Sequence, residues 1–208
     1  GDSTMSSILK VDNLQTGAGA THSISSLGVT SPGTVLQQIY GICDGRIVSG
    51  ITFQDVTAPQ SLTTSHVEMT GSSVSYTPPT GATTVVYSYT FHFDATDNGG
   101  ISHYQFMIDG TAVSTLGRRT HAGAYQSNSH TTNRIAYEFP ILIDSTIASD
   151  DIPNLKLKSW TSARTLSMTA REYGSSYDVV IHQNVWWDGA GAGSNQLSRP
   201  TLSIKAIA

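Results

Sequence analysis

The chain has 208 residues and a formal net charge of −4, a length that fits one β domain with an extension or two small domains. Charged residues make up only 12% of it, against about 25% in an average globular protein. Such low charge with 38% hydrophobic residues excludes a disordered chain, and the single cysteine, Cys43, excludes an intrachain disulfide. The polar surface must consist mostly of uncharged groups, because 28 residues are serine and 26 are threonine.

Charge and hydropathy also exclude two classes of partner. The basic residues are scattered, and Arg118-Arg119 is the one place where two arginines adjoin, so there is no basic stripe for phosphates. No apolar run approaches the ~18 residues that a membrane-spanning helix needs. We therefore expect neither a nucleic acid nor a membrane as a partner.

Residues 1–32 are rich in serine, threonine and glycine, and large side chains concentrate in Ile8–Gln15. Such a segment has few partners of its own, so we interpret residues 1–32 as an N-terminal extended arm that docks on a neighbouring subunit or an assembly scaffold. A short edge strand of the same domain is the open alternative. Gly1–Thr4, ahead of Met5, are expected to be a cloning remnant.

Residues 33–208 are expected to form a β domain, within which residues 33–72 are open to interpretation as a small subdomain. Two strands are predicted between Thr34 and Phe53, joined as a hairpin at Asp44-Gly45, because Asp-Gly between apolar runs is a strong hairpin signal. The Thr/Ser-rich stretch 57–73 shows little periodicity and is predicted to be a loop with one short strand near His66–Met69.

Period-two patterns dominate the rest of the chain. Large residues alternate with smaller ones over 85–93 and again over 104–108, and Asp109-Gly110 predicts a tight turn after the second run. Pro140 predicts an edge position or a bulge for the strand 135–143. Residues 179–187 lack alternation, which predicts a strand buried on both faces. About ten strands at 8–12-residue spacing, without an amphipathic helix, predict an all-β sandwich or barrel.

Several short strings resemble virion structural proteins of marine bacteriophages. They are Ser7–Thr16 (SILKVDNLQT), Tyr76–Gly81, Ile101–Thr111, Ser159–Ser162 and Trp186–Gly189. The resemblance implies an all-β, jelly-roll-like antiparallel β-sandwich, similar to the heads of tumour necrosis factor and C1q. It also implies a tail fibre, spike or capsid-decoration protein located in the virion. Such a protein would form a homo-oligomer, a trimer, and contact other virion proteins through the arm. The resemblance brings no catalytic residues with it.

The polar segment 116–133 is the candidate ligand-binding region. Arg118, Arg119, His121, Tyr125 and Gln126 offer planar donors and an aromatic face, and Trp187 offers a second stacking surface. Groups of this kind suit sugars or acidic glycans, such as those of a host surface, which need hydrogen bonds and a stacking platform. A contact between subunits and an inert surface are the alternatives. For Trp186 we expect a place in the core, because alternation should bury at least one of the two tryptophans.

Metal and catalytic chemistry find little support. The seven histidines match no zinc motif, although His92, His103 and His182 would gather around an ion if their strands were adjacent. We expect instead half-exposed histidines that are hydrogen-bonded on a sheet face. The oxygen-rich segment 94–100 lacks the spacing of an EF-hand and is interpreted as a turn rather than a calcium loop. No Gly-x-Ser-x-Gly elbow and no well-placed carboxylate pair is present, so we expect no catalytic residue, metal or cofactor.

Three functions therefore compete. The first is a non-enzymatic virion structural protein that forms an oligomer and binds glycans. The second is a free-standing carbohydrate-binding module, which predicts a monomer with a flat aromatic face. The third is a depolymerase, which predicts a carboxylate pair in a groove between subunits.

Overall fold

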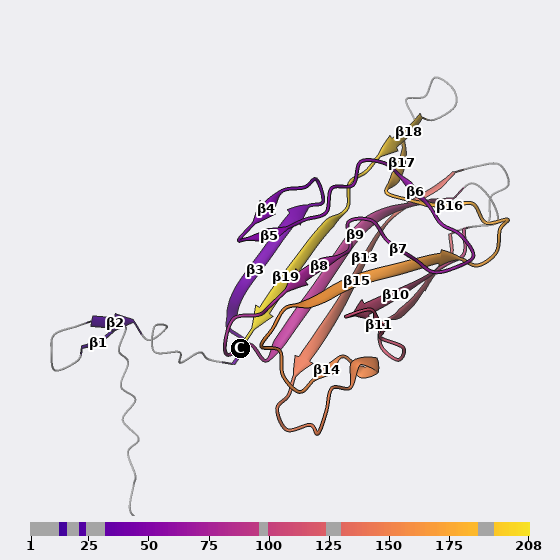
Figure 1. Cartoon of the computed structure of the whole chain (residues 1–208). Helices are drawn as coiled ribbons and strands as arrows, with labels where there is room; N and C mark the ends of the chain where they lie inside the picture. The colour runs from indigo at the N-terminus through magenta and orange to yellow at the C-terminus, as the bar shows by residue number, and fades with distance from the viewer. Residues whose placement is uncertain (1–12, 16–20, 24–31, 96–99, 124–129, 187–193) are drawn as a thin grey trace, which may run out of the picture.

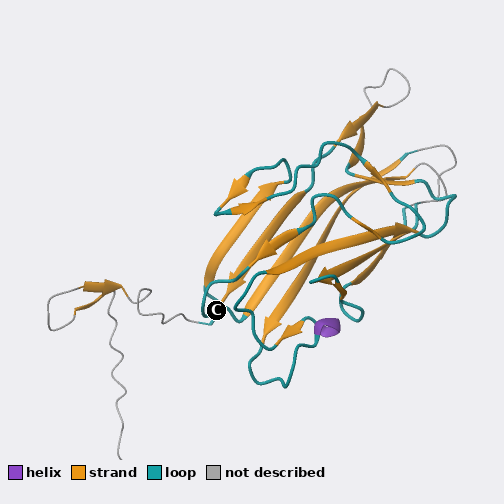
Figure 2. Cartoon of the chain, in the orientation of Figure 1, coloured by secondary structure: helices purple, strands orange, loops and turns teal. Residues whose placement is uncertain are grey.

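The computed structural model describes residues 13–15, 21–23, 32–95, 100–123, 130–186 and 194–208. From residue 32 on, the described residues form an antiparallel β-sandwich (Figures 1 and 2). The first sheet contains β14 (Lys156–Leu157), β13 (Thr131–Ile143), β9 (Thr84–Ala95), β19 (Thr201–Ile207), β16 (Val179–Ile181), β3 (Val35–Ile42) and β6 (Gln60–Ser61). The second contains β12 (Arg118–His121), β11 (Thr111–Ala112), β10 (Ser102–Ile108), β15 (Arg164–Glu172), β7 (Val67–Glu68) and β8 (Val74–Tyr76).

The strand order is that of a jelly roll. Four strands of each sheet define this order, which is β3-β19-β9-β13 in the first sheet and β8-β15-β10-β12 in the second. Along the chain these strands alternate between the two sheets, except that β10 and β12 follow one another within the second sheet. Such repeated crossing distinguishes a jelly roll from a meander. The predicted all-β, jelly-roll-like sandwich is therefore confirmed.

Three short strand pairs lie outside the two sheets. They are β1 (Asn13–Gln15) with β2 (Thr21–Ser23), β4 (Ile47–Val48) with β5 (Ile51–Thr52), and β17 (Gln183–Trp186) with β18 (Ser194–Leu197). The 3-10 turn η2 (Ile152–Asn154) precedes β14. In the described part of the chain, no helix has the length and apolar character to cross a membrane.

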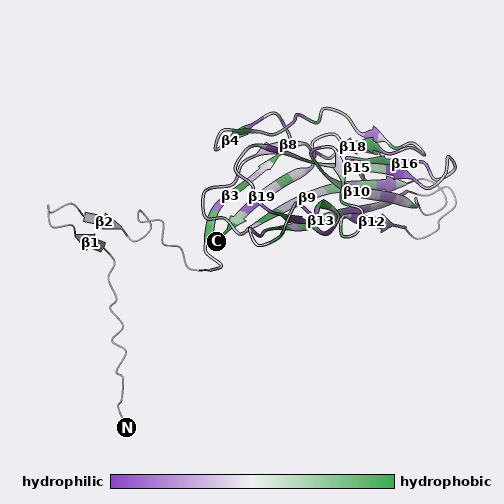
Figure 3. Ribbon diagram, turned by 60° about the horizontal axis from the view of Figure 1, so that its bottom comes forward, coloured by the Kyte–Doolittle hydropathy of each residue, from purple (hydrophilic) through white to green (hydrophobic). Residues whose placement is uncertain are grey.

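The core follows the predicted alternation of β9. Its side chains at 85, 87, 89, 91 and 93 are at most 1% exposed, whereas those between them are only partly buried. Hydrophobic and hydrophilic residues accordingly follow one another along the strands in Figure 3. Phe106 of β10 stacks on Phe139 of β13 with ring centroids 4.5 Å apart, which joins the two sheets. The buried hydroxyls of Tyr87 and Tyr89 donate to the carbonyls of Ser72 and Thr70 at 2.7 Å.

Two local predictions are confirmed. Asp109 and Gly110 both adopt positive φ (50° and 73°) in the turn between β10 and β11, as a two-residue hairpin with this sequence requires. Pro140 lies in β13 opposite Val86 of β9. On its other side β13 pairs only at Leu142 and Ile143, with β14, so the missing amide hydrogen of Pro140 faces an unpaired edge.

The hairpin predicted at Asp44-Gly45 is wrong. The strand before it, β3, pairs with β19 instead, and the strand after it, β4, pairs with β5. The carboxylate of Asp44 accepts hydrogen bonds from the backbone and side chain of Arg46, which turns the chain out of the sheet. The hairpin forms five residues later, where Ser49 and Gly50 both have positive φ.

The single buried strand predicted over 179–187 is also corrected. His182 has a φ of 63°, and this left-handed residue separates β16, in the first sheet, from β17, in its own pair. Alternation restarts after the break, so Val185 is buried and Trp186 is 63% exposed. The expectation that Trp186 belongs to the core is therefore wrong.

Residues 33–72 belong to the sandwich, whereas the described strands of the N-terminal part do not pair with it. Within residues 1–32, the described strands β1 and β2 pair with each other and not with either large sheet, while most of the proposed arm lies outside the described residues. Residues 33–72 supply β3 and β6 to the first sheet and β7 to the second. The arm and its docking role stay predictions.

Cys43 lies at the end of β3 and is fully buried. Its thiol donates to the carbonyl of Gly71 at 3.2 Å. Burial, reinforced by the nearby Asp44 carboxylate, raises the pKa of the thiol to about 12. The side chain acts as a small core residue and not as a nucleophile.

The imidazole of His182 is buried between the sheets. Its ring lies edge-on to Tyr89 and Phe91, with ring centroids 6.4 and 6.2 Å away, and neither ring nitrogen is hydrogen-bonded within the described part of the chain. Burial lowers the pKa of His182 to about 4, and the nearby Thr70 carbonyl opposes this shift only in part. The native state therefore holds this side chain neutral.

We predict that acid destabilises the protein partly through His182. The unfolded chain protonates this histidine near pH 6.5, whereas the folded chain does so only near pH 4, so stability falls as pH falls between these values. Protonation of His182 alone should lower the unfolding free energy by about 3 kcal/mol over that range. In His182→Asn the new asparagine tolerates a left-handed backbone. When urea unfolding is measured at several pH values, the unfolding free energy of this variant should fall less steeply with falling pH. His103→Asn, at a half-exposed position, should change this pH dependence far less, and an equal effect would contradict the assignment.

Candidate functional site

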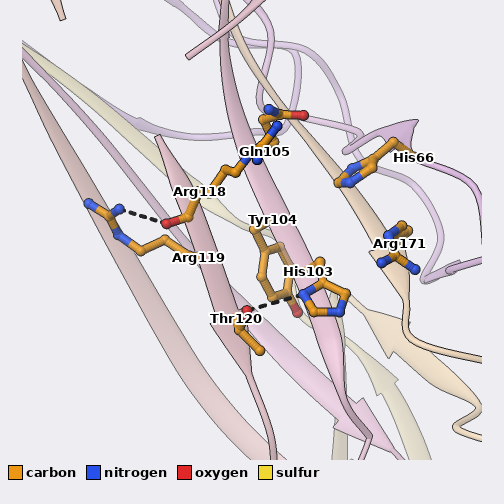
Figure 4. Close-up of a pocket in the computed structure, with 8 residues that line it drawn as sticks. All are labelled: His66, His103, Tyr104, Gln105, Arg118, Arg119, Thr120 and Arg171. Carbon is orange, nitrogen blue, oxygen red and sulfur yellow. Dashed lines mark hydrogen bonds between the residues drawn. The ribbon is translucent and has the colours of Figure 1, made fainter. Parts of the chain in front are cut away.

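A polar cleft lies on the outer face of the second sheet (Figure 4). Its volume of about 340 Å³ is at the lower end of the range for small-ligand pockets, about 300–1,000 Å³. Its lining residues come from β10, β12, β15 and the segment before β7, and they are His66, His103, Tyr104, Gln105, Arg118, Arg119, Thr120 and Arg171. No lining residue among them is acidic.

The pleat of the sheet places these side chains together. On β10, Tyr104 and Phe106 point into the core, so His103 and Gln105 point outward. In register, His103 lies between Thr120 of β12 and Arg171 of β15, and Gln105 lies next to Arg118. Residues distant in sequence thus form one continuous polar surface across three neighbouring strands.

Threonine hydroxyls hold the two histidines of the cleft. Nδ1 of His103 lies 3.1 Å from the hydroxyl of Thr120, and Nδ1 of His66 lies 3.3 Å from that of Thr169. In the described part of the chain, neither Nε2 atom has a protein partner. These atoms are therefore available to a ligand.

The cleft is electropositive. Partial burial lowers the pKa of His66, and the positive charges of Arg171, His103 and Arg118 lower it further. Burial and Arg171 likewise lower the pKa of His103. Neither Arg118 nor Arg171 makes an ion pair with any described residue, although Arg171 donates to the carbonyl of Glu172 at 3.1 Å.

An aromatic surface adjoins the cleft. Tyr173 is 58% exposed, and its ring centroid lies 6.0 Å from that of His103. Tyr177 packs edge-on against Tyr173 at 5.5 Å, which fixes the orientation of the exposed ring. The site thus combines charge, uncharged hydrogen-bonding groups and an aromatic face.

Of the residues predicted to bind a ligand, strand alternation places only some in the cleft. Arg118 lies in the cleft, but the Arg119 side chain points the other way (Figure 4), with its guanidinium 4.9 Å from the centre of the Phe139 ring. Arg119 also donates to the carbonyls of Leu116 and Arg118 at 2.8 Å. The ring of His121 packs on that of Phe93 with centroids 4.5 Å apart, and its buried Nε2 has no hydrogen-bond partner among the described residues. Tyr125, Gln126 and Trp187 lie outside the described residues.

Six residues that line the cleft are not among the predicted ligand-binding residues: His66, His103, Tyr104, Gln105, Thr120 and Arg171. The signal that places His103 and Gln105 on an outer face was present, since the alternation of residues 104–108 was recognised. The pairing of β10 with β12 and β15 has no local signature in the sequence, so the convergence of their polar residues could not be predicted.

The histidines considered as metal ligands do not converge. His92 belongs to the first sheet, where Nδ1 lies 2.6 Å from the hydroxyl of Ser198, whereas His103 belongs to the second. His182 lies buried between the sheets. The described residues contain no group of three histidine, cysteine or acidic side chains that could hold a metal ion.

A second polar cluster surrounds the carboxylate of Asp94, which is fully buried near the end of β9. One oxygen accepts from Nε2 of Gln183 at 2.6 Å and lies 2.8 Å from Nδ1 of His130, and the other accepts from Thr132 at 3.3 Å. These partners belong to β17, to β13 and to the residue just before β13. The carboxylate therefore ties three segments together, which is a structural role.

Comparison with known proteins adds no family. No protein-family model matches the chain, and no curated protein matches it. Among solved structures, the C-terminal domain of EclA, described as a sugar-binding protein, matches at 13% identity. The match covers 74% of this chain and 78% of the EclA domain with a TM-score of 0.28. A score this low does not establish a common fold, so the fold rests on the strand order described above.

We predict that Asp94→Ala lowers the unfolding free energy by about 3 kcal/mol, because it removes the buried acceptor that Gln183, His130 and Thr132 share. Urea denaturation at neutral pH measures this loss. The control is Asp55→Ala, which removes an exposed carboxylate 3.6 Å from Arg199 and should cost less than about 1 kcal/mol. Equal losses in the two variants would show that the Asp94 cluster carries no special share of the stability.

Proposed function

We propose that the protein is a non-enzymatic binding module that takes a saccharide in the cleft on the outer face of its second sheet. The observation that carries this proposal is the cleft itself, with His103, Gln105 and Arg118 beside the exposed ring of Tyr173. A saccharide needs hydrogen bonds to its hydroxyls and an apolar surface for its C–H groups, and this site offers both. The scaffold is rigid, because the polar residues stand on strands whose opposite faces form the core.

The proposed setting is a virus particle, as a tail fibre, spike or capsid-decoration protein of a bacteriophage. The support is the resemblance of Ser7–Thr16 and of four strings within 76–189 to such proteins. In this setting the cleft would contact glycans of the host surface, and residues 1–32 would contact other virion proteins.

We further propose that the protein works as a homo-oligomer, a trimer. The outer face of the first sheet is broad and carries mainly uncharged polar side chains, among them Ser88, Thr90, Thr201 and Ser203. A sister subunit can cover such a face without desolvating many charges. Closed assembly also removes exposed sheet edges, which otherwise favour aggregation.

A free-standing carbohydrate-binding module is the second candidate. It would use the same cleft and the same aromatic ring, so the site does not separate it from the virion protein. The oligomeric state separates the two, because a free module is expected to be a monomer.

We predict that saccharide binding depends on the cleft and not on the opposite face of the sandwich. Binding is first screened on a glycan array and then quantified by isothermal titration calorimetry. Gln105→Ala and Tyr173→Ala should each weaken binding about tenfold, since each removes one hydrogen-bonding or stacking contact. Ser88→Ala, on the first sheet, should leave affinity unchanged. Loss of binding in the Ser88 variant with retention in the other two would place the saccharide elsewhere.

We predict a molar mass near three chains for the full-length protein in light scattering. A shortened chain that starts at Thr34 tests the arm: if it falls to a monomer, residues 1–33 hold the assembly together. If the shortened chain stays trimeric, the sandwich itself forms the interface. A monomer in both forms would contradict the trimer and favour the free-standing module.

A further inference from the structure

We infer that the saccharide bound by this cleft is acidic, with its carboxylate or sulfate groups held by Arg118 and Arg171. This inference rests on the proposed function, because it names the ligand class of the same site. It is carried by the position of the two guanidinium groups and by the charge around them.

The two arginines flank the cleft from opposite sides. Arg118 belongs to β12 and Arg171 to β15, with β10 between them. The register offsets them by two residues along β10, since Arg118 is opposite Gln105 and Arg171 is opposite His103. Strand spacing and rise then put their Cα atoms about 12 Å apart. Two anionic groups on one oligosaccharide, or one group reached by both long side chains, fit this separation.

Neither guanidinium group has an acidic partner among the described residues, although Arg171 donates one hydrogen bond to the carbonyl of Glu172. In the described part of the chain they make no ion pair, whereas Arg46, Arg164 and Arg199 each pair with an aspartate. A guanidinium presents a planar fork of donors that matches a carboxylate or sulfate. Arg118 and Arg171 can therefore each bind an anionic group in the cleft.

The local charge opposes the charge of the whole protein. The chain carries a formal net charge of −4, yet four cationic or protonatable side chains surround one cleft: His66, His103, Arg118 and Arg171. A positive patch on an acidic protein attracts anions to one place and disfavours general adhesion to polyanions. Selective binding of an acidic sugar agrees better with this distribution than binding of nucleic acid does.

The histidines add a pH response. His66 faces Arg171, His103 and Arg118 on the neighbouring strands, with Glu68 two residues along its own segment, and His103 faces Arg171, Thr120 and Tyr173. Partial burial and, after it, the surrounding positive charge lower the pKa of both imidazoles and so favour their neutral form near pH 7. A bound anion offsets that charge and favours protonation, so affinity rises as pH falls through the histidine range. The ligand's carboxylates and sulfates stay ionised there.

The test uses matched pairs of polysaccharides that differ only in charge, with the full chain at moderate salt. One pair is polygalacturonate and its methyl ester, and the other is chondroitin sulfate and unsulfated chondroitin. We expect at least one acidic polymer to bind about tenfold or more tightly than its less charged partner in calorimetry. Equal binding of both members of each pair would overturn the acidic ligand while leaving the saccharide proposal intact. Binding of no member of either pair would overturn both.

Arginine variants separate the site from general charge attraction. Arg118→Gln and Arg171→Gln should each weaken binding of the acidic polymer about tenfold and leave its less charged partner unaffected. The control is Arg134→Gln, which removes the same charge from an exposed position on the first sheet. An equal loss in the Arg134 variant would show non-specific attraction and overturn the assignment.

Histidine variants test the pH response. The acidic polymer should bind several-fold more tightly at about pH 5.5 than at about pH 7.5, and the double variant His66→Gln/His103→Gln should lose this difference. A flat profile in the unaltered protein would exclude the histidines from the site.

Discussion

The whole architecture depends on the alternation of side chains in the long strands β9, β10 and β13. Because successive residues point to opposite faces, each strand places a row of aromatic rings between the sheets and a row of polar groups outside. The rings of Phe106 and Phe139 stack between the sheets, and the ring centroid of Tyr87 lies 4.9 Å from that of Phe106. With no disulfide available, this aromatic layer is what holds the two sheets together.

The same alternation creates the cleft. A row of core residues on β10 requires a row of outward residues, and these are His103 and Gln105. Neighbouring strands repeat the arrangement, so β12 adds Arg118 and Thr120 and β15 adds Arg171. The cleft therefore stands on rigid strands, and packing the core also sets the spacing of the binding groups. A substitution that shifts the register of β10 would disrupt both.

The sequence predicted the strands better than their partners. Patterns within one segment, such as the aromatic alternation of β9 or the Asp109-Gly110 turn, depend on local chemistry and were predicted correctly. Asp44-Gly45 shows where such local patterns fail. The dipeptide predicts a hairpin, but β3 pairs with β19, and the turn leads the chain out of the sheet. The break at His182 could not be predicted, because histidine is not a residue that marks a left-handed backbone in the way glycine or asparagine does, yet φ is 63° there. For the site, the sequence predicts Arg118 correctly, but it groups Arg119 and His121 with it, because the alternation of β12, which turns these two side chains away from the cleft, shows only in the structure.

The buried thiol described above has a practical consequence. Cys43 is the single cysteine of the sequence, and with a pKa of about 12 it is almost wholly protonated at neutral pH as well as inaccessible. A cysteine introduced on the surface would thus be the one thiol that reacts with a maleimide, without removal of the native one. A fluorophore beside the cleft or a tether on the opposite sheet can be attached at one chosen point. The fold is in effect already prepared for site-specific labelling.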